Sequence, residues 1–492
     1  MNAAVFRRFA SALLSIALGL PVFAESDHER EEWPALRWTV FPLRVTAQRT
    51  VPAQPWKKEP PERRTGYAVA ISSNRLLTVE SLVRDHTLVE LGQSESARFV
   101  GIRVVRADRE RNLALMDVTG TPFEGRLYPL PVADRPALNR SGTLVHIVEG
   151  GAFQKGAALL LRGLMEGTDE SIPPIPALSF LSELPVNGNG APVLMEGALA
   201  GLVARYETAS RLGVLIPGCS LRRFAEEAHS DTYRGAALAG FSWAPLPDPA
   251  LRAFLRVPAT VTEGVLILKT RAGSGAAALL QPNDVLIEWD GHPIDHQGYY
   301  RDDWLGALPF PALIAFSSPG QAIPIVWIRN GEHHQGTLSL SATADLPSRV
   351  PAYDPAPPPW LIEGGLIFRD LSGDYLRAAG ANWLMRANAR LVRLFLAGRD
   401  ETAVNGERVP ILVSVLPDAI NVGYQEISDA IVTHVNGTPV QSLMDIRAVR
   451  ARDGAIERVR VSHLDVELVL DREALAEANA RIAANYRIPV AP

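Results

Sequence analysis

The 492-residue chain contains only one cysteine, Cys219, and its charges nearly balance. A single cysteine excludes an intramolecular disulfide and any metal cluster built from several thiolates. Lys and Arg together number 49 against 54 Asp and Glu, so we expect no nucleic acid or anionic membrane as partner. Apolar residues make up 47%, which excludes a disordered or collagen-like chain and fits about three globular domains.

Metal and phosphate motifs are also missing from the sequence. It contains no H-E-x-x-H pair and no glycine-rich phosphate loop after a strand. His333 and His334 follow the Asn-Gly turn of an expected hairpin, where a solvent-exposed pair is the expectation. Cys219 opens an expected helix and is predicted to be buried or unreactive. We therefore expect no metal site and no cofactor.

Residues 1–24 have the pattern of a secretory signal peptide. Arg7 and Arg8 precede an apolar stretch that ends in small or modest residues at Val22 and Ala24. A membrane anchor is the alternative, but the apolar stretch is shorter than the ~20 residues that a spanning helix needs. No later segment is long and apolar enough to span a bilayer. The sequence thus predicts an exported protein, periplasmic or extracellular, with no integral membrane segment after cleavage.

The rest of the chain divides into a β-rich part and a repeated small module. Residues 25–232 alternate short apolar runs with Gly, Pro, Asn and Ser clusters, which predicts a barrel or sandwich closed by a strand and a helix. Two later segments, D-V-L-I-E-W-D-G-H-P-I and D-A-I-V-T-H-V-N-G-T-P-V, share a strand, a tight turn and a Pro-containing exit. They predict one module at 233–345 and a divergent copy at 361–492 with a C-terminal helix. The Pro-rich stretch 346–360 is expected to connect them without joining either core.

Three segments of the β-rich part resemble, in order, motifs of the trypsin-like domain of Deg/HtrA proteases. They are T-G-Y-A-V-A-I-S-S-N-R-L-L-T-V-E-S-L-V, A-D-R-E-R-N-L-A-L-M-D-V and V-N-G-N-G-A-P-V-L-M-E-G-A-L-A-G-L-V. The repeated module resembles a PDZ domain, and the C-terminal part is most similar to the plant-type Deg branch with its modified second PDZ domain. The resemblance implies a mainly β chain, with a trypsin-like double β-barrel followed by two PDZ-type α+β domains.

The catalytic positions implied by this resemblance hold the wrong residues. Aligned on the family motifs, Ser81 stands at the histidine position, Asn112 at the aspartate position and Asn189 at the serine position. Serine-protease chemistry needs a hydroxyl, an imidazole and a carboxylate that fixes the imidazole tautomer. Shifting the alignment recovers no nucleophile, because residues 183–209 contain no serine or cysteine, and the nearby His86 is expected in a solvated loop. We therefore expect a catalytically inactive homologue, with an active serine endopeptidase of unrecognised arrangement as the alternative.

Peptide binding is the function that remains. PDZ domains add an extended peptide to a sheet edge and hold its carboxylate on the N–H groups of a Gly-containing loop. By the resemblance, Leu238, Ala239, Gly240 and Phe241 occupy that loop, although they could instead form only the entry strand of the module. The second module is expected to dock and to support oligomers more than to bind ligand. The expected partners are polypeptide segments or protein C-termini, further copies of the chain, and an active Deg paralogue. The sequence therefore leaves two alternatives: a free-standing scaffold or chaperone-like binder, and a regulatory subunit of an active paralogue.

Overall fold

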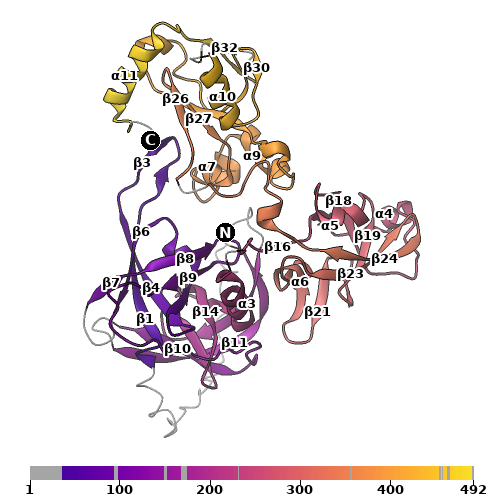
Figure 1. Cartoon of the computed structure of the whole chain (residues 1–492). Helices are drawn as coiled ribbons and strands as arrows, with labels where there is room; N and C mark the ends of the chain where they lie inside the picture. The colour runs from indigo at the N-terminus through magenta and orange to yellow at the C-terminus, as the bar shows by residue number, and fades with distance from the viewer. Residues whose placement is uncertain are drawn as a thin grey trace, which may run out of the picture.

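The computed structural model of the chain describes residues 36–92, 98–148, 152–167, 174–230, 232–354, 357–453, 456, 458–462 and 466–489. The expected signal peptide at 1–24 lies outside these residues. Within the described ranges, no helix has the length and apolar character to cross a membrane. Figure 1 shows three bodies along the colour ramp: an indigo-to-magenta barrel domain, a first module in red to orange, and a second module in orange to yellow.

The first half of the barrel domain is a seven-stranded antiparallel sheet in the order β7-β6-β1-β4-β5-β9-β8. Alternate residues of β1 are buried, as expected for a strand with one face on a core. The elements of this half are β1 (Val40–Ala47), β2 (Thr50–Val51), β3 (Gln54–Lys58), β4 (Glu62–Ala70), β5 (Arg75–Thr78), α2 (Glu80–Val83), β6 (His86–Gly92), β7 (Phe99–Gly101), β8 (Arg103–Asp108) and β9 (Leu113–Asp117).

The second half of the barrel domain is a closed six-stranded barrel in the order β10-β11-β12-β15-β14-β13. A helix, α3, follows the last strand and packs its apolar face on the first half through Leu221 and Phe224. The elements are β10 (Ser141–Ile147), β11 (Phe153–Glu166), β12 (Ile175–Ser182), β13 (Pro192–Met195), β14 (Ala198–Glu207), β15 (Leu212–Pro217) and α3 (Gly218–Ala228). The predicted closing strand and helix are confirmed.

The first module is a sheet of order β17-β18-β19-β23-β24 with short helices around it. Strand β16 pairs with β25 instead of joining this sheet, so β17 is an edge strand of the described sheet. The elements are β16 (Ala237–Leu238), β17 (Phe241–Ala244), α4 (Pro249–Phe254), β18 (Val265–Thr270), α5 (Gly275–Leu279), β19 (Val285–Trp289), β20 (His292–Pro293), β21 (Tyr299–Asp302), β22 (Gly306–Pro309), α6 (Pro311–Ala315), β23 (Ala322–Arg329), β24 (Glu332–Ser339), β25 (Ser341–Ala342) and η2 (Thr343–Asp345).

The second module repeats this topology, with a sheet of order β26-β27-β28-β29-β31-β32. Strands β27 to β32 of this path correspond in order to β17, β18, β19, β23 and β24, and β26 is an added edge strand. The elements are β26 (Leu361–Glu363), β27 (Leu366–Asp370), α7 (Gly373–Arg377), α8 (Trp383–Arg386), α9 (Ala389–Gly398), η3 (Val404–Gly406), β28 (Pro410–Val415), η4 (Ala419–Asn421), β29 (Ala430–Val435), β30 (Thr438–Pro439), α10 (Leu443–Asp453), β31 (Arg458–Val461), β32 (Val466–Val469) and α11 (Leu475–Tyr486).

The predicted internal repeat is visible at its two turns. Asp290 and Gly291 have φ angles of 50° and 76°, and Asn436 and Gly437 have 49° and 78°. Two consecutive residues with positive φ make a type I′ turn, which joins two tightly paired strands and favours Asn-Gly or Asp-Gly. In both modules this turn connects a sheet strand to a short return strand, β20 or β30.

The Pro-rich stretch 346–360 is not a connector outside the cores, and that prediction is wrong at two points. Val350 is fully buried in the second module, where it belongs to the same apolar cluster as Phe395 and packs against Gly398 of α9. Trp360 lies against Trp56 of the β2–β3 hairpin of the barrel domain, with ring centroids 5.7 Å apart. The proline content limited the backbone conformation, but it did not keep apolar side chains in this stretch from packing.

The barrel domain and the first module share one continuous apolar core. Leu160 of β11 and Trp289 of β19 belong to the same buried cluster. The β21–β22 hairpin makes the contact: the indole N–H of Trp304 donates to the Pro136 carbonyl at 2.9 Å. Gly163 of β11 faces Leu305 so closely that a Cβ at Gly163 would lie 2.6 Å from the leucine Cβ. The first module is therefore packed on the barrel and not tethered loosely beside it.

Candidate functional site

The three positions predicted from the protease motifs meet in one pocket of about 330 Å³. Ser81 comes from the start of α2, Asn112 from the turn between β8 and β9, and Asn189 from the turn before β13. The backbone N–H of Ser81 donates to Oδ1 of Asn112 at 2.9 Å. Asn112 is buried and has a left-handed φ of 50°, a conformation that asparagine tolerates better than most residues. The pocket lies between the two halves of the barrel domain.

The amide side chains of this pocket are held in place by hydrogen bonds. Nδ2 of Asn187 and Nδ2 of Asn189 each donate to the Thr65 carbonyl at 3.0 Å. The backbone N–H of Asn189 donates to Oδ1 of Asn187 at 3.4 Å. An N–H of such a turn is the type of donor that would stabilise an oxyanion. Here the carboxamide oxygen of Asn187 accepts this N–H, so the N–H is not available to an oxyanion.

The lining of this pocket offers no proton acceptor of the serine-protease kind. Among its described lining residues there is no histidine and no cysteine, and Ser81 is the one serine. His86 is exposed at the start of β6, where its Nδ1 lies 2.7 Å from the Val83 carbonyl oxygen, and it does not line the pocket. His146 is engaged with the Tyr67 hydroxyl, and burial lowers the pKa of its imidazole.

The loop at 238–241 lines a second pocket of about 380 Å³, formed by β17, α6 and the barrel domain. Leu238 ends β16, Ala239 and Gly240 form the turn, and Phe241 begins β17. Gly240 has a φ of 79°, and a Cβ there would lie 2.2 Å from Cβ of Ser274, so only glycine fits. Within the described residues, the N–H groups of Ala239 and Gly240 have no hydrogen-bond acceptor. The loop therefore offers two free N–H donors beside an open strand edge, an arrangement that can accept a carboxylate and an added strand.

The corresponding edge of the second module is covered by its own chain. Strand β26 pairs antiparallel with β27, with Leu361 opposite Phe368 and Glu363 opposite Leu366. Strand β27 is the counterpart of β17, so β26 lies where a peptide would add to the second module. An incoming peptide therefore finds no free edge on β27 of the second module, whereas β17 of the first module leaves one open.

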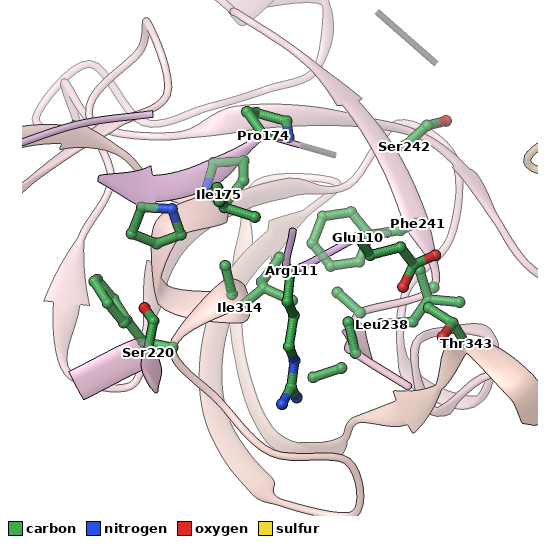
Figure 2. A pocket seen from close by; sticks show the side chains of 18 of the residues that line it. Glu110, Arg111, Pro174, Ile175, Ser220, Leu238, Phe241, Ser242, Ile314 and Thr343 are labelled. Carbon is green, nitrogen blue, oxygen red and sulfur yellow. The ribbon is translucent and has the colours of Figure 1, made fainter. Parts of the chain in front are cut away.

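The two pockets adjoin, and Glu110 and Ile175 line both. Figure 2 shows Glu110 beside Thr343, and the guanidinium of Arg111 in the lower centre of the groove. Burial and the nearby Asp108 raise the pKa of the Glu110 carboxyl to about 7, although the neighbouring polar groups of Thr343 and Ala236 partly offset this. Glu110 is thus a carboxyl group, near half protonation at neutral pH, at the junction of the two pockets.

The sequence did not indicate that the groove has walls from outside the first module. Ile216, Ser220 and Arg223 of the barrel domain line it, and so do Arg399 and Asp400 of the second module. These residues lie far apart in the chain, and only the packing of the three bodies brings them together.

Two further sequence expectations concern chemistry outside the pockets. Cys219 is half-buried in the first turn of α3, and burial raises the pKa of its thiol. His333 is exposed on β24, whereas His334 is half-buried and stacks on Trp327. Across the described part of the chain, no group of three or more His, Cys, Asp and Glu residues is placed to hold a metal ion.

Comparisons with known proteins cover almost the whole chain. The PDZ domain family model matches residues 349–491. Protease Do-like 2, chloroplastic, of Arabidopsis thaliana is 26% identical over 471 residues, which cover 91% of this chain and 74% of that protein. Protease Do-like 4, mitochondrial, of the same plant is 22% identical over 453 residues, covering 89% and 81%. Among solved structures, the HtrA-type protease AlgW with decapeptide aligns with 64% of this chain and 99% of its own, at 17% identity and a TM-score of 0.47.

Proposed function

We propose that this chain, a homologue of the Do-like proteases of the Deg/HtrA family, is an exported pseudoprotease that binds polypeptide C-termini without cleaving them. The family resemblance is confirmed by the Arabidopsis relatives and the PDZ match. The relatives are named proteases, so the proposal departs from them in chemistry and not in architecture.

The observation that carries the proposal is the content of the pocket at Ser81, Asn112 and Asn189. These positions are together in space, yet the pocket lining supplies no imidazole to accept a proton. Loss of the aspartate alone lowers the rate by about 10⁴ in a serine protease, because the imidazole takes the wrong tautomer. Each missing oxyanion donor lowers it by about 10² to 10³ more. Hydrolysis at this pocket would be negligible against the family's ordinary rate.

The groove of the first module supports the binding half of the proposal. Strand β17 has an open edge, and the apolar side chains of Leu238, Phe241 and Ile314 line the pocket beside it. The free N–H groups at Ala239 and Gly240 are at the end where a terminal carboxylate would sit. With its edge covered by β26, the second module serves instead to dock on the rest of the chain.

The test combines an activity probe with a binding measurement on the chain from residue 25. We expect no casein hydrolysis and no labelling by a fluorophosphonate probe. We also expect micromolar binding of peptides with a free apolar C-terminus, about −8 kcal/mol, measured by fluorescence anisotropy. The same peptides with an amidated terminus should bind at least several-fold more weakly, because amidation removes the carboxylate that the N–H groups of the loop would bind.

Two results would overturn the proposal. Probe labelling that disappears when one serine is mutated would identify an active endopeptidase, the alternative reading of the sequence. Equal affinity for acid and amide peptides would show that the loop at 238–241 does not hold a carboxylate. Sedimentation of the chain, alone and with an active Deg paralogue, separates a self-assembling binder from a regulatory subunit.

A further inference from the structure

Arginine side chains of the barrel domain line the same groove as the open edge of β17. Arg111, in the turn before β9, and Arg223, on α3, both line the groove, and neither belongs to the first module. Figure 2 shows the Arg111 side chain between Ile314 and Leu238 of the groove lining. A peptide added to β17 would therefore have the sheet edge on one side and two cations of the barrel on the other.

The acidic partners in this region are already engaged. Nη1 of Arg111 donates to Glu227 at 2.6 Å, and the Ser318 hydroxyl of the first module donates to the other oxygen of Glu227 at 2.7 Å. Asp108 accepts the backbone N–H of Glu110 at 2.8 Å and the Tyr233 hydroxyl. Glu227 therefore pairs directly with Arg111 and offsets the charge of Arg223 only in part.

Each arginine has hydrogen-bonding capacity left over. Nη2 of Arg111 is buried and makes no hydrogen bond to any described residue. Arg223 is half-buried and has no ion-pair partner in the described part of the chain. Burial, together with the positive charge of Arg111, lowers the pKa of Arg223, although Glu227 partly offsets this. Because Glu227 is already paired with Arg111 at 2.6 Å, Arg223 is the arginine with more capacity for a further anion.

The charges that line the groove favour an anion as well. Arg111, Arg223 and Arg399 face Glu110 and Asp400. Asp400 lies 3.9 Å from Arg399, and the raised pKa of Glu110, about 7, leaves it only partly charged at neutral pH. With Arg111 paired to Glu227 and Arg399 next to Asp400, the remaining charges are those of Arg223 and the partly protonated Glu110, in a cavity whose other walls are apolar, where a charge pair is stronger than in water.

We propose that the barrel wall of this groove selects peptides with an acidic side chain among their last four residues, which Arg223 binds. The number follows from β17, which has four residues along which a peptide can pair. The inference rests on the proposed function, because it assigns a ligand class to the same groove. It adds that ligand recognition needs both the barrel domain and the first module.

The experiment compares peptides that differ at a single position, where one carries the carboxylate of Glu and the other the amide of Gln. Peptides with an apolar free C-terminus carry Glu or Gln at the second, third or fourth position from the end, and their binding to the full chain is measured by anisotropy. At one of these positions the Glu peptide should bind about tenfold more tightly than the Gln peptide. That preference should weaken as salt rises, because salt screens charge pairs.

Variants of α3 provide the matched control. Arg223→Met should abolish the preference for Glu and leave the affinity for the Gln peptide unchanged, and Arg223→Glu should reverse the preference toward a Lys peptide. The neighbouring Arg222 is 43% exposed and pairs with Asp134 at 2.6 Å, outside the groove lining. Arg222→Met should therefore behave like the unmodified chain in every binding measurement.

The outcomes separate the two proposals. Binding of free-acid peptides with equal affinity for Glu and Gln at all three positions overturns the acidic selectivity and leaves the proposed function standing. An unchanged Glu preference in Arg223→Met would also overturn it. Failure of every peptide, acid or amide, to bind overturns the proposed function itself.

Discussion

Replacing Asp374 with Asn is expected to release the second module from the barrel domain. Arg109, in the turn between β8 and β9, donates from Nη1 to Oδ2 of Asp374 at 2.8 Å and from Nη2 to Oδ1 at 3.0 Å. The guanidinium of Arg109 also lies 4.2 Å from the ring centre of Tyr353. Burial would raise the pKa of Asp374, but Arg109 and Arg377 hold it below its ordinary value. The carboxylate is thus ionised and bidentate at neutral pH.

The magnitude follows from the exposure of the pair. The side chains of Arg109 and Asp374 are 22% and 25% exposed, between a surface pair and a buried one. A surface pair contributes about 0–1 kcal/mol, and breaking a buried pair costs about 3–5 kcal/mol. We therefore expect Asp374→Asn to weaken docking by about 2 kcal/mol, roughly a 30-fold shift of the docking equilibrium.

Domain separation, not global melting, is the quantity to measure, since unfolding of a chain with several domains is not a two-state process. We expect a larger radius of gyration by small-angle X-ray scattering and faster proteolysis within 346–360. Arg109→Asp combined with Asp374→Arg should restore both values toward those of the unmodified chain. Glu401→Gln, which removes an exposed pair with Arg349, should change neither. An unchanged radius of gyration and an unchanged proteolysis pattern in Asp374→Asn would refute the role of the Arg109–Asp374 pair in docking the second module.

Two further predictions concern the adjoining pockets. Glu110→Gln should flatten the pH dependence of stability. Burial raises the pKa of Glu110 in the folded state from its ordinary 4.5 to about 7, so its contribution to stability is full below about pH 4.5 and is lost as pH rises through 7. Denaturant titrations should then find the variant more stable at pH 8, by up to about 3 kcal/mol, with no gain at pH 4; an equal gain at both would contradict this. The triple change Ser81→His, Asn112→Asp, Asn189→Ser should fold but cleave casein barely, because Oδ1 of Asn187 still accepts the N–H at position 189. Robust cleavage by the triple variant would show that the oxyanion donors are intact.

The local features of the fold could be predicted from the sequence because they are set by neighbouring residues. The turns at Asp290-Gly291 and Asn436-Gly437 need positive φ, and their residues reveal it. Ser274 directly precedes α5, and its hydroxyl accepts the N–H of Ala277 as an N-cap does. The grouping of Ser81, Asn112 and Asn189 was predicted by the ordered motifs, each of which fixes a strand and the turn beside it.

The features that depended on packing between domains could not be predicted. Val350 lies in a Pro-rich stretch that composition marks as a connector, and its burial depends on α9, which follows it in the chain. The covering of β27 by β26 likewise distinguishes the second module from the first, although both share the repeat. Arg223 looked like an ordinary charged residue of a closing helix, and only the docked first module makes it part of a groove.

The five-residue turn from Asp108 to Asn112 contacts all three bodies. Arg109 binds Asp374 of the second module, Glu110 lies beside Thr343 of the first, and Asn112 accepts the N–H of Ser81 in the barrel pocket. In an active serine protease, a residue here must hold an imidazole within a fraction of an ångström for catalysis. Asn112 holds only a backbone N–H, so the turn can shift without loss of a reaction. A ligand that contacts Arg111 in the groove therefore acts on the same five-residue turn that clamps the second module, and peptide binding and module docking should be thermodynamically coupled.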